Sequence, residues 1–158
     1  MLENHADSRV LGYLGRGLSL ELSAVQLYST QARLLVAWGL AEQSARFSEE
    51  AMEEMGHADR IIGRMLALGV TPGASQLRPV RLGRNLQELL VYNHAFENEL
   101  INLYYNAARY CANNADHENR LFFEELLKEE QSHAQTLAQW LKEIEQAGAS
   151  AGKMDSSH

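Results

Sequence analysis

The apolar residues of this chain recur at alternating steps of three and four along four segments, the spacing of one face of an α-helix. We expect helices over residues 8–36, 41–69, 85–112 and 116–146. Together the four apolar faces predict an all-α bundle of four helices around one shared core. Ser8 is the expected cap of the first helix, and Asn85 with Glu88 resembles a capping box before the third.

The connections between the predicted helices differ in length. Short turns are expected near Trp38–Gly39 and near Asn114, whereas Val70–Arg84 holds both prolines and is too long for a tight turn. We expect this segment to cross the bundle and join two helical hairpins. Residues 1–146 form the predicted domain. The stretch 147–158 has almost no apolar residues, so we expect a disordered tail in place of a fifth helix.

Each predicted helix carries titratable side chains on its apolar face. The six residues are Glu21, Glu54, His57, Glu97, Glu130 and His133. They form two matched sets, because in each set a Glu-x-x-His begins 33 residues after a single glutamate. A carboxylate buried alone costs several kcal/mol, so four of them need a common partner. A pair of divalent cations is such a partner, and this residue set is the one that di-metal four-helix bundles use.

The two sets also agree in height along the bundle. Glu21 lies 17 residues before Trp38 and Glu54 lies 16 after it, and the second set repeats these offsets around Asn114. At about 1.5 Å per residue, each glutamate lies about 25 Å from its turn. A single Glu-x-x-His is more often a solvated pair than a metal site. The repetition at one spacing and one height favours the metal site.

A tyrosine follows the leading glutamate of each set by seven residues, Tyr28 in the first and Tyr104 in the second. On a core face, a tyrosine can pack with its hydroxyl bonded to a ligand carboxylate. We favour that supporting role for both residues. Participation of Tyr28 in redox chemistry is the alternative.

Composition narrows the classes of function. A net charge of −7 makes nucleic acid an unsuitable partner and is compatible with attracting cations. The single cysteine, Cys111, excludes an internal disulfide framework, suits a reducing compartment, and is expected to pack inertly. The sequence shows no export leader and no apolar run of membrane-spanning length, so we expect a cytoplasmic protein.

With these motifs in view, the chain resembles the bacterioferritins from about residue 8 to about residue 147. The run Glu54–Arg60 (EMGHADR) is the most specific match, and the turn Trp38–Leu40 and the long crossover also agree. The resemblance implies a ferritin-like four-helix bundle with a ferroxidase centre of two iron ions in each subunit. It implies terminal ligands on one iron from Glu21 and His57, terminal ligands on the other from Glu97 and His133, and bridges from Glu54 and Glu130.

Met55 follows Glu54 and therefore points about 100° away from the metal ligands. On its own, a methionine there indicates packing at a subunit contact. The resemblance implies instead that Met55 from two subunits binds haem b at a twofold axis. Ser29 and Ser48 replace bulkier residues that the family often has near this haem.

The resemblance also implies a homo-oligomer, a hollow 24-subunit shell built from twofold dimers. Residues 148–152 occupy the place of the fifth helix that lines the family's fourfold pores. Without that helix, a haem-bridged dimer is the smaller alternative.

The expected function is iron storage and detoxification, in which Fe(II) is oxidised by O2 or H2O2 and stored as ferric mineral. Carboxylate and imidazole ligands suit iron or manganese. The alternatives are a non-storage di-metal oxidase or peroxidase of the same fold, and a metal-free helical scaffold, which leaves the paired ligands unexplained.

Further polar residues lie near the expected centre. Glu50 lies on the core face one turn before Glu54 and is the candidate for metal entry. For Glu49 and Glu53, a solvated face is as well supported as a role in attracting metal. Asn93 is expected to orient a ligand histidine, and His94 to lie at the surface.

Overall fold

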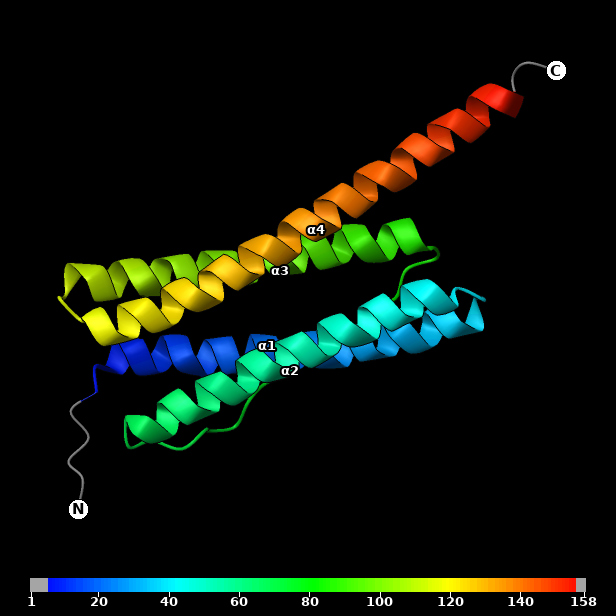
Figure 1. The fold of residues 1–158 in the computed structure, drawn as a ribbon. Coiled ribbons are helices and arrows are strands. Elements are labelled where there is room, and N and C mark those ends of the chain that lie inside the picture. Colours follow the sequence, from blue (N-terminus) through cyan, green and yellow to red (C-terminus); the bar gives the residue numbers. More distant parts are fainter. Residues whose placement is uncertain (1–5, 156–158) are drawn as a thin grey trace.

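The structure, a computed structural model, describes residues 6–155. Within this range there are four α-helices and no strand: α1 (Ser8–Ala37), α2 (Ala41–Ala67), α3 (Leu86–Asn113) and α4 (His117–Asp155). Figure 1 shows them as two hairpins, α1 with α2 and α3 with α4, lying one against the other. The predicted all-α bundle of four helices is confirmed.

Tight turns close both hairpins where the sequence predicts them. Gly39 adopts φ of 78°, a conformation that costs glycine little, and the Leu40 N–H donates to Leu35 O at 2.9 Å. The second turn has no glycine, and Ala115 adopts φ of 55° there. The Asp116 N–H closes this turn on Cys111 O at 2.9 Å.

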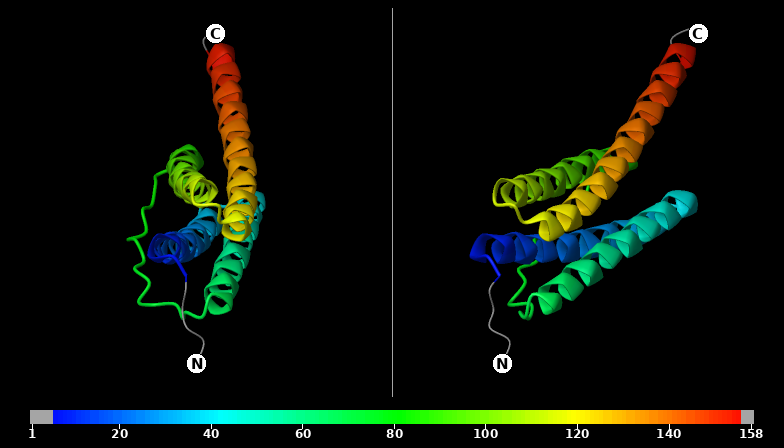
Figure 2. Two further views of the ribbon diagram at one scale, coloured as in Figure 1. Left: turned by 90° about the vertical axis from the view of Figure 1, so that its left-hand side faces the viewer. Right: turned by 60° about the vertical axis from the view of Figure 1, so that its left-hand side comes forward.

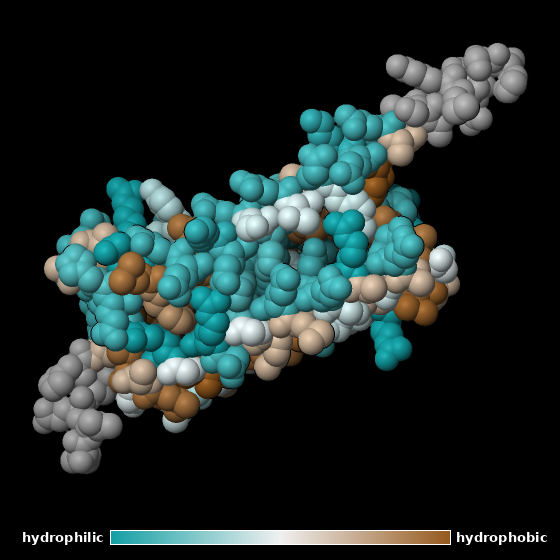
Figure 3. Space-filling model, viewed as in Figure 1, coloured by the Kyte–Doolittle hydropathy of each residue, from teal (hydrophilic) through white to brown (hydrophobic). Residues whose placement is uncertain are grey.

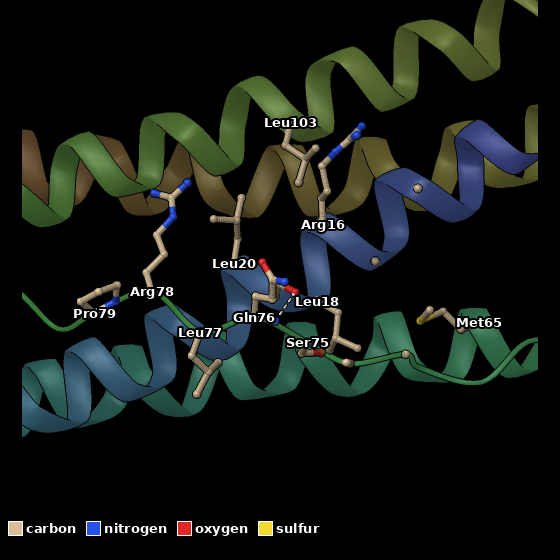
Figure 4. Close-up of a pocket in the computed structure, with 15 residues that line it drawn as sticks. Arg16, Leu18, Leu20, Met65, Ser75, Gln76, Leu77, Arg78, Pro79 and Leu103 are labelled. Atoms are coloured by element: carbon tan, nitrogen blue, oxygen red, sulfur yellow. Dashed lines mark hydrogen bonds between the residues drawn. The ribbon is translucent and has the colours of Figure 1, made fainter.

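The crossover joins α2 to α3 without regular structure and runs beside the bundle (Figure 2). Two serines of α1 hold its backbone: the Gln76 N–H donates to Ser19 Oγ at 3.2 Å, and the Arg78 N–H donates to Ser23 Oγ at 3.0 Å. The Arg78 side chain points toward α3, where it pairs with Glu99 at 2.6 Å (Figure 4). The crossover and the first half of α1 border a groove of about 660 Å³.

The starts of α1 and α3 agree with the predictions only in part. Asp7, not Ser8, caps α1, because its carboxylate accepts from the Arg9 N–H at 2.7 Å. Asn85 caps α3 as predicted, accepting from the Glu88 N–H at 2.9 Å. The Glu88 carboxylate, however, accepts from the N–H of Arg84, not from that of Asn85.

The C-terminal end of α4 also differs from the prediction. The helix continues to Asp155, whereas a disordered tail was expected from residue 147. Alanine is the best helix former, no proline interrupts the segment, and each residue added to an existing helix needs no new nucleus. This end of α4 projects past the other three helices (Figure 1). Residues 156–158 of the predicted tail lie outside the described residues.

The apolar core falls into two clusters. One includes Leu14, Leu18 and Phe123, and the other includes Phe47 and Trp140. Buried polar side chains interrupt this core, four glutamates among them. No helix within residues 6–155 is long and apolar enough to cross a bilayer.

Candidate metal centre

The six residues singled out from the sequence meet in the middle of the bundle. They form two groups whose possible ligand atoms lie within 4.8 Å of one another. The first group is Glu21, Glu54, His57 and Glu130. The second group is Glu54, Glu97, Glu130 and His133. Glu54 and Glu130 belong to both groups, so they lie between two neighbouring positions for an ion. We refer to the six residues as the six-residue cluster.

The carboxylates of the cluster are more deeply buried than its histidines. The four glutamates of the cluster are at most 1% exposed. His57 is buried as well, with 6% of its side chain exposed, whereas 20% of the His133 side chain is exposed. A carboxylate at this depth is costly unless hydrogen bonds or cations surround it.

Each histidine contacts the shared glutamate of the opposite hairpin. His57 Nδ1 lies 2.6 Å from Glu130 Oε1, and His133 Nδ1 lies 3.0 Å from Glu54 Oε1. The two rings are stacked, with centroids 5.9 Å apart and planes inclined by 14°. Both Nδ1 atoms therefore face the glutamates, the orientation in which they can act as metal ligands.

Two tyrosines hold the unshared glutamates across the hairpins. The Tyr28 hydroxyl donates to Glu97 Oε1 at 2.6 Å, and the Tyr104 hydroxyl donates to Glu21 Oε1 at 2.6 Å. Burial and the neighbouring carboxylates raise the pKa of both phenols well above the usual value, so they stay protonated donors. Gly17 makes room for Tyr104, because a Cβ there would lie 3.3 Å from its ring.

The second oxygen of each cluster glutamate lacks a hydrogen-bond partner among the described residues. The Oε2 atoms of Glu21, Glu54, Glu97 and Glu130 are buried without a hydrogen-bond partner in the described part of the chain. Native proteins rarely leave buried polar atoms unsatisfied, so these four oxygens are positions that a bound ion could satisfy. The donor set, carboxylate oxygens and imidazole nitrogens without a thiolate, fits iron or manganese.

The close packing of buried carboxylates shifts the pKa values of the cluster glutamates. Burial, with the charges of Glu21 and Glu97, raises the pKa of Glu54 well above its usual value. Burial and the charge of Glu54 do the same to the pKa of Glu130. Burial also opposes ionisation of Glu21, but hydrogen bonds involving Glu54 and His57 outweigh it and lower the Glu21 pKa. The cluster thus binds protons that a cation would displace.

An acidic groove leads toward His133 between α2 and α4. It has a volume of about 380 Å³ and includes Glu49, Glu50, Glu53 and His133 in its lining. Figure 3 shows that the face formed by α2 and α4 is largely hydrophilic. Burial, with the charges of Glu97 and Glu53, raises the pKa of Glu50 to about 8, and its Oε2 also lacks a partner among the described residues.

Asn93 does not orient a histidine, contrary to the prediction. Its amide exchanges two hydrogen bonds with the amide of Gln31 on α1, at 2.9 and 2.7 Å. Both side chains are fully buried, so each amide satisfies the other. His94 is half-buried and lies 3.5 Å from the Asn98 amide.

The contacts on the outer side of the two histidines were not predicted from the sequence. Glu129 lies 3.2 Å from His57 Nε2, and Glu53 contacts His133 Nε2. A signal existed, because each motif reads Glu-Glu-x-x-His and the extra glutamate occurs in both copies.

Met55 lies apart from the cluster, on the outer surface of α1 and α2. It lines a groove of about 480 Å³ together with Ser29, Ser48 and Met52. Met55 is 46% exposed and Met52 is 76% exposed, a large apolar exposure for a bundle surface. If two Met55 residues were to hold one haem iron, the second would have to come from another copy of the chain.

Fold and site together define a ferritin-like four-helix bundle with a buried carboxylate and histidine cluster that could bind metal, and comparison with known proteins agrees on the fold. The ferritin-like domain family matches residues 11–147. The bacterioferritin of Rhodobacter capsulatus is 38% identical over 131 residues, which cover 83% of this chain and 81% of that protein. A bacterial ferritin of Synechocystis is 34% identical over 140 residues, which cover 88% and 90%.

The fold of a relative solved by experiment is also similar. The structure of Rhodobacter capsulatus bacterioferritin superposes with a TM-score of 0.85 at 35% identity, covering 89% of this chain and 88% of that one. That protein has a metal-free dinuclear site and a haem iron in a crystallographic special position. The present chain belongs to the bacterioferritin family. Membership of this family supports a role in iron storage.

Proposed function

We propose that this protein oxidises Fe(II) at the six-residue cluster and stores the ferric product inside an oligomeric shell. The observation that carries the proposal is the set of four buried carboxylate oxygens that lack a hydrogen-bond partner among the described residues, within two overlapping ligand groups. A metal-free scaffold would gain nothing from four such carboxylates, because each weakens the fold unless a cation compensates it.

The grouping of the side chains suggests their roles. Glu21 and His57 occur only in the first group and would hold one ion. Glu97 and His133 occur only in the second group and would hold the other. Glu54 and Glu130 occur in both, which supports bridging roles. Tyr28 and Tyr104 would orient the unshared glutamates.

In the proposed reaction, iron is the substrate. Two Fe(II) ions lose two electrons to one O2, which takes up two protons and becomes H2O2. With H2O2 as the oxidant, the same two electrons and two protons yield two water molecules. Glu54 and Glu130 give up their protons when the ions bind, and their negative charges then stabilise the ferric product.

The haem proposal rests on the groove at Met55. Its exposed thioether and the neighbouring apolar surface of Met52 suit one face of a flat, largely apolar group, and a second copy would supply the opposite face. Ser29 and Ser48, both small side chains, also line this groove. A haem b held in this way would supply electron transfer, and sulfur ligation favours Fe(II).

We further propose a cytoplasmic homo-oligomer built from twofold dimers, as a 24-subunit shell. The apolar surface at Met52 and Met55 is the face proposed for the dimer contact.

Burial raises the pKa of Cys111 to about 11, so its thiol is an unreactive core residue, in keeping with the sequence prediction.

The decisive experiment is a crystal soak with Fe(II) or Zn(II). We expect two ions between the side chains of the six-residue cluster. Absence of ions there, with the side chains turned to solvent, would refute the centre. Native mass and retention of a ferric mineral separate storage from a non-storage oxidase or peroxidase, for which we expect iron oxidation by small assemblies that retain no mineral.

A further inference from the structure

The outer nitrogens of the two histidines have unequal surroundings. His57 Nε2 lies 3.2 Å from Glu129 Oε2 on α4, and His133 Nε2 contacts Glu53 Oε2 on α2. Each contact therefore crosses from one hairpin to the other. Both Nδ1 atoms face the six-residue cluster, so Nε2 is the nitrogen left to donate once Nδ1 binds an ion.

A carboxylate on that outer nitrogen matters for metal binding. It fixes the ring orientation, selects the tautomer with the free lone pair toward the metal, and raises ligand basicity. Removal of such a partner usually lowers metal affinity about 10–100-fold.

The carboxylate at His57 is itself held in place. Arg60 Nη1 donates to Glu129 Oε2 at 2.5 Å, and Arg60 Nη2 lies 3.5 Å from Glu125 Oε2. By contrast, Glu53 pairs with His133 and with no arginine or lysine among residues 6–148, whose side chains the structure describes. His133 is also the more exposed histidine.

The net charge of the surroundings alone would favour metal binding at the position beside His133. Glu53 leaves a negative charge beside His133, whereas Arg60 neutralises Glu129. Glu53 and Glu129 are 55% and 48% exposed, however, so water and salt screen both charges. The two positions differ more in how firmly the histidine is held, because Arg60 pairs with Glu129 and His57 is almost fully buried. We expect this ordering of His57 to dominate.

We propose that Glu129 and Arg60 are positioning residues that act through His57 and make the position beside Glu21 and His57 the tighter of two unequal metal positions. This inference rests on the proposed two-metal centre. It predicts ordered filling, with the first ion bound beside His57 and the second beside His133.

The test measures the binding of Co(II) to the purified metal-free protein by calorimetry. Crystals soaked with less than one Co(II) per chain would show, by anomalous scattering, which position fills first. For the wild type we expect two affinities and higher occupancy beside His57. Glu129→Gln should weaken the tighter site about 10–100-fold and reduce the preference for that position.

Four further variants separate positioning from a general loss of charge. Arg60→Gln should weaken the same site by a smaller factor, and Arg60→Lys should restore most of the loss. Glu53→Gln should weaken only the site beside His133. Glu143→Gln removes the same charge from an exposed side chain of α4 that does not contact Arg60, and it should leave both affinities within about twofold.

The outcomes distinguish this inference from the function on which it rests. If the wild type binds two Co(II) ions but Glu129→Gln leaves both affinities unchanged, the inference is wrong and the proposed centre stands. Equal filling of both positions in the wild type would overturn it too. A wild type that binds no Co(II) would overturn the centre and the inference together.

Discussion

Tyr28 and Glu97 lie 69 residues apart in the chain, yet the phenol donates to the carboxylate at 2.6 Å in the buried middle of the bundle. The same contact recurs between Tyr104 and Glu21 with the helices exchanged, also at 2.6 Å. Each hairpin thus orients a ligand of the other, which gives the two tyrosines equivalent positions.

Because the positions are equivalent, Tyr28→Phe and Tyr104→Phe should have similar effects. Each removes a hydrogen bond to a carboxylate, worth about 1.4 kcal/mol, and should weaken Co(II) binding about tenfold. Calorimetry on the metal-free proteins measures the loss. Slowed iron oxidation in Tyr28→Phe alone, with metal affinity intact and a tyrosyl radical in the wild type, would instead assign Tyr28 a redox role.

Glu130→Ala should abolish the fast phase of Fe(II) oxidation, because Glu130 belongs to both ligand groups. Stopped-flow absorbance after addition of Fe(II) in air measures this phase, with an expected amplitude of two irons per chain in the wild type. Glu143→Ala, which removes an exposed carboxylate from the same helix, is the control. A fast phase that survives Glu130→Ala would place the chemistry elsewhere.

Metal binding should release protons near pH 7. Glu54 and Glu130 have raised pKa values in the metal-free protein, so they hold protons that an ion must displace. The apparent affinity for Zn(II) should therefore increase with pH. Calorimetry in buffers of different ionisation enthalpy counts the protons. An affinity that stays constant from about pH 6 to about pH 8 would contradict the predicted protonation.

Glu50→Gln should stabilise the metal-free protein at high pH. The folded-state pKa of Glu50 is about 8 against an ordinary 4.5, so its favourable contribution is complete below 4.5 and is lost as the pH rises through 8. At pH 8 and above, we expect the variant to gain about 1–3 kcal/mol in free energy of unfolding, since part of the side chain remains wetted. The two proteins should be equally stable near pH 4.

Denaturant unfolding at both pH values measures the Glu50 effect. Glu49→Gln is the matched control, because Glu49 is an exposed neighbour on the same helix and its removal should change the pH dependence little. Parallel stability profiles for the wild type and Glu50→Gln would show that Glu50 ionises without cost.

Met55→Leu should abolish the low-spin spectrum of bound haem without unfolding the bundle. Leucine has a similar volume but no sulfur, so packing is retained while the axial ligand is lost. The visible spectrum after expression with ample haem measures this change, and native mass shows whether the oligomer persists. A wild type without haem, or a variant with the same spectrum, would leave Met55 as an interface residue only.

The six-residue cluster could be predicted because two independent sequence signals agree on it. Helical periodicity places each residue on a core face, and the repeated spacing places the two sets at one height. Each signal still identifies the cluster when a predicted helix boundary is wrong by one or two residues. The cap of α1 cannot be predicted with the same tolerance, because Asp7 and Ser8 are adjacent and both can cap a helix.

The partner of Asn93 could not be predicted for a different reason. Gln31 reaches it from α1 because of how the two helices are rotated against each other, and the chain's own spacing does not determine that rotation. The end of α4 could not be predicted either. In this alanine- and glycine-rich segment the low apolar content indicated a tail, whereas small differences in helix propensity determine where the helix ends.

Each ligand group takes three residues from one hairpin and one from the other: Glu130 completes the group of the first hairpin, and Glu54 completes that of the second. An ion bound at either position would therefore act as a non-covalent cross-link between the halves of the molecule. If the chain were cut within the crossover, neither fragment would hold a complete set of ligands. Reassociation of the two fragments should then depend on metal, and a chelator should separate them.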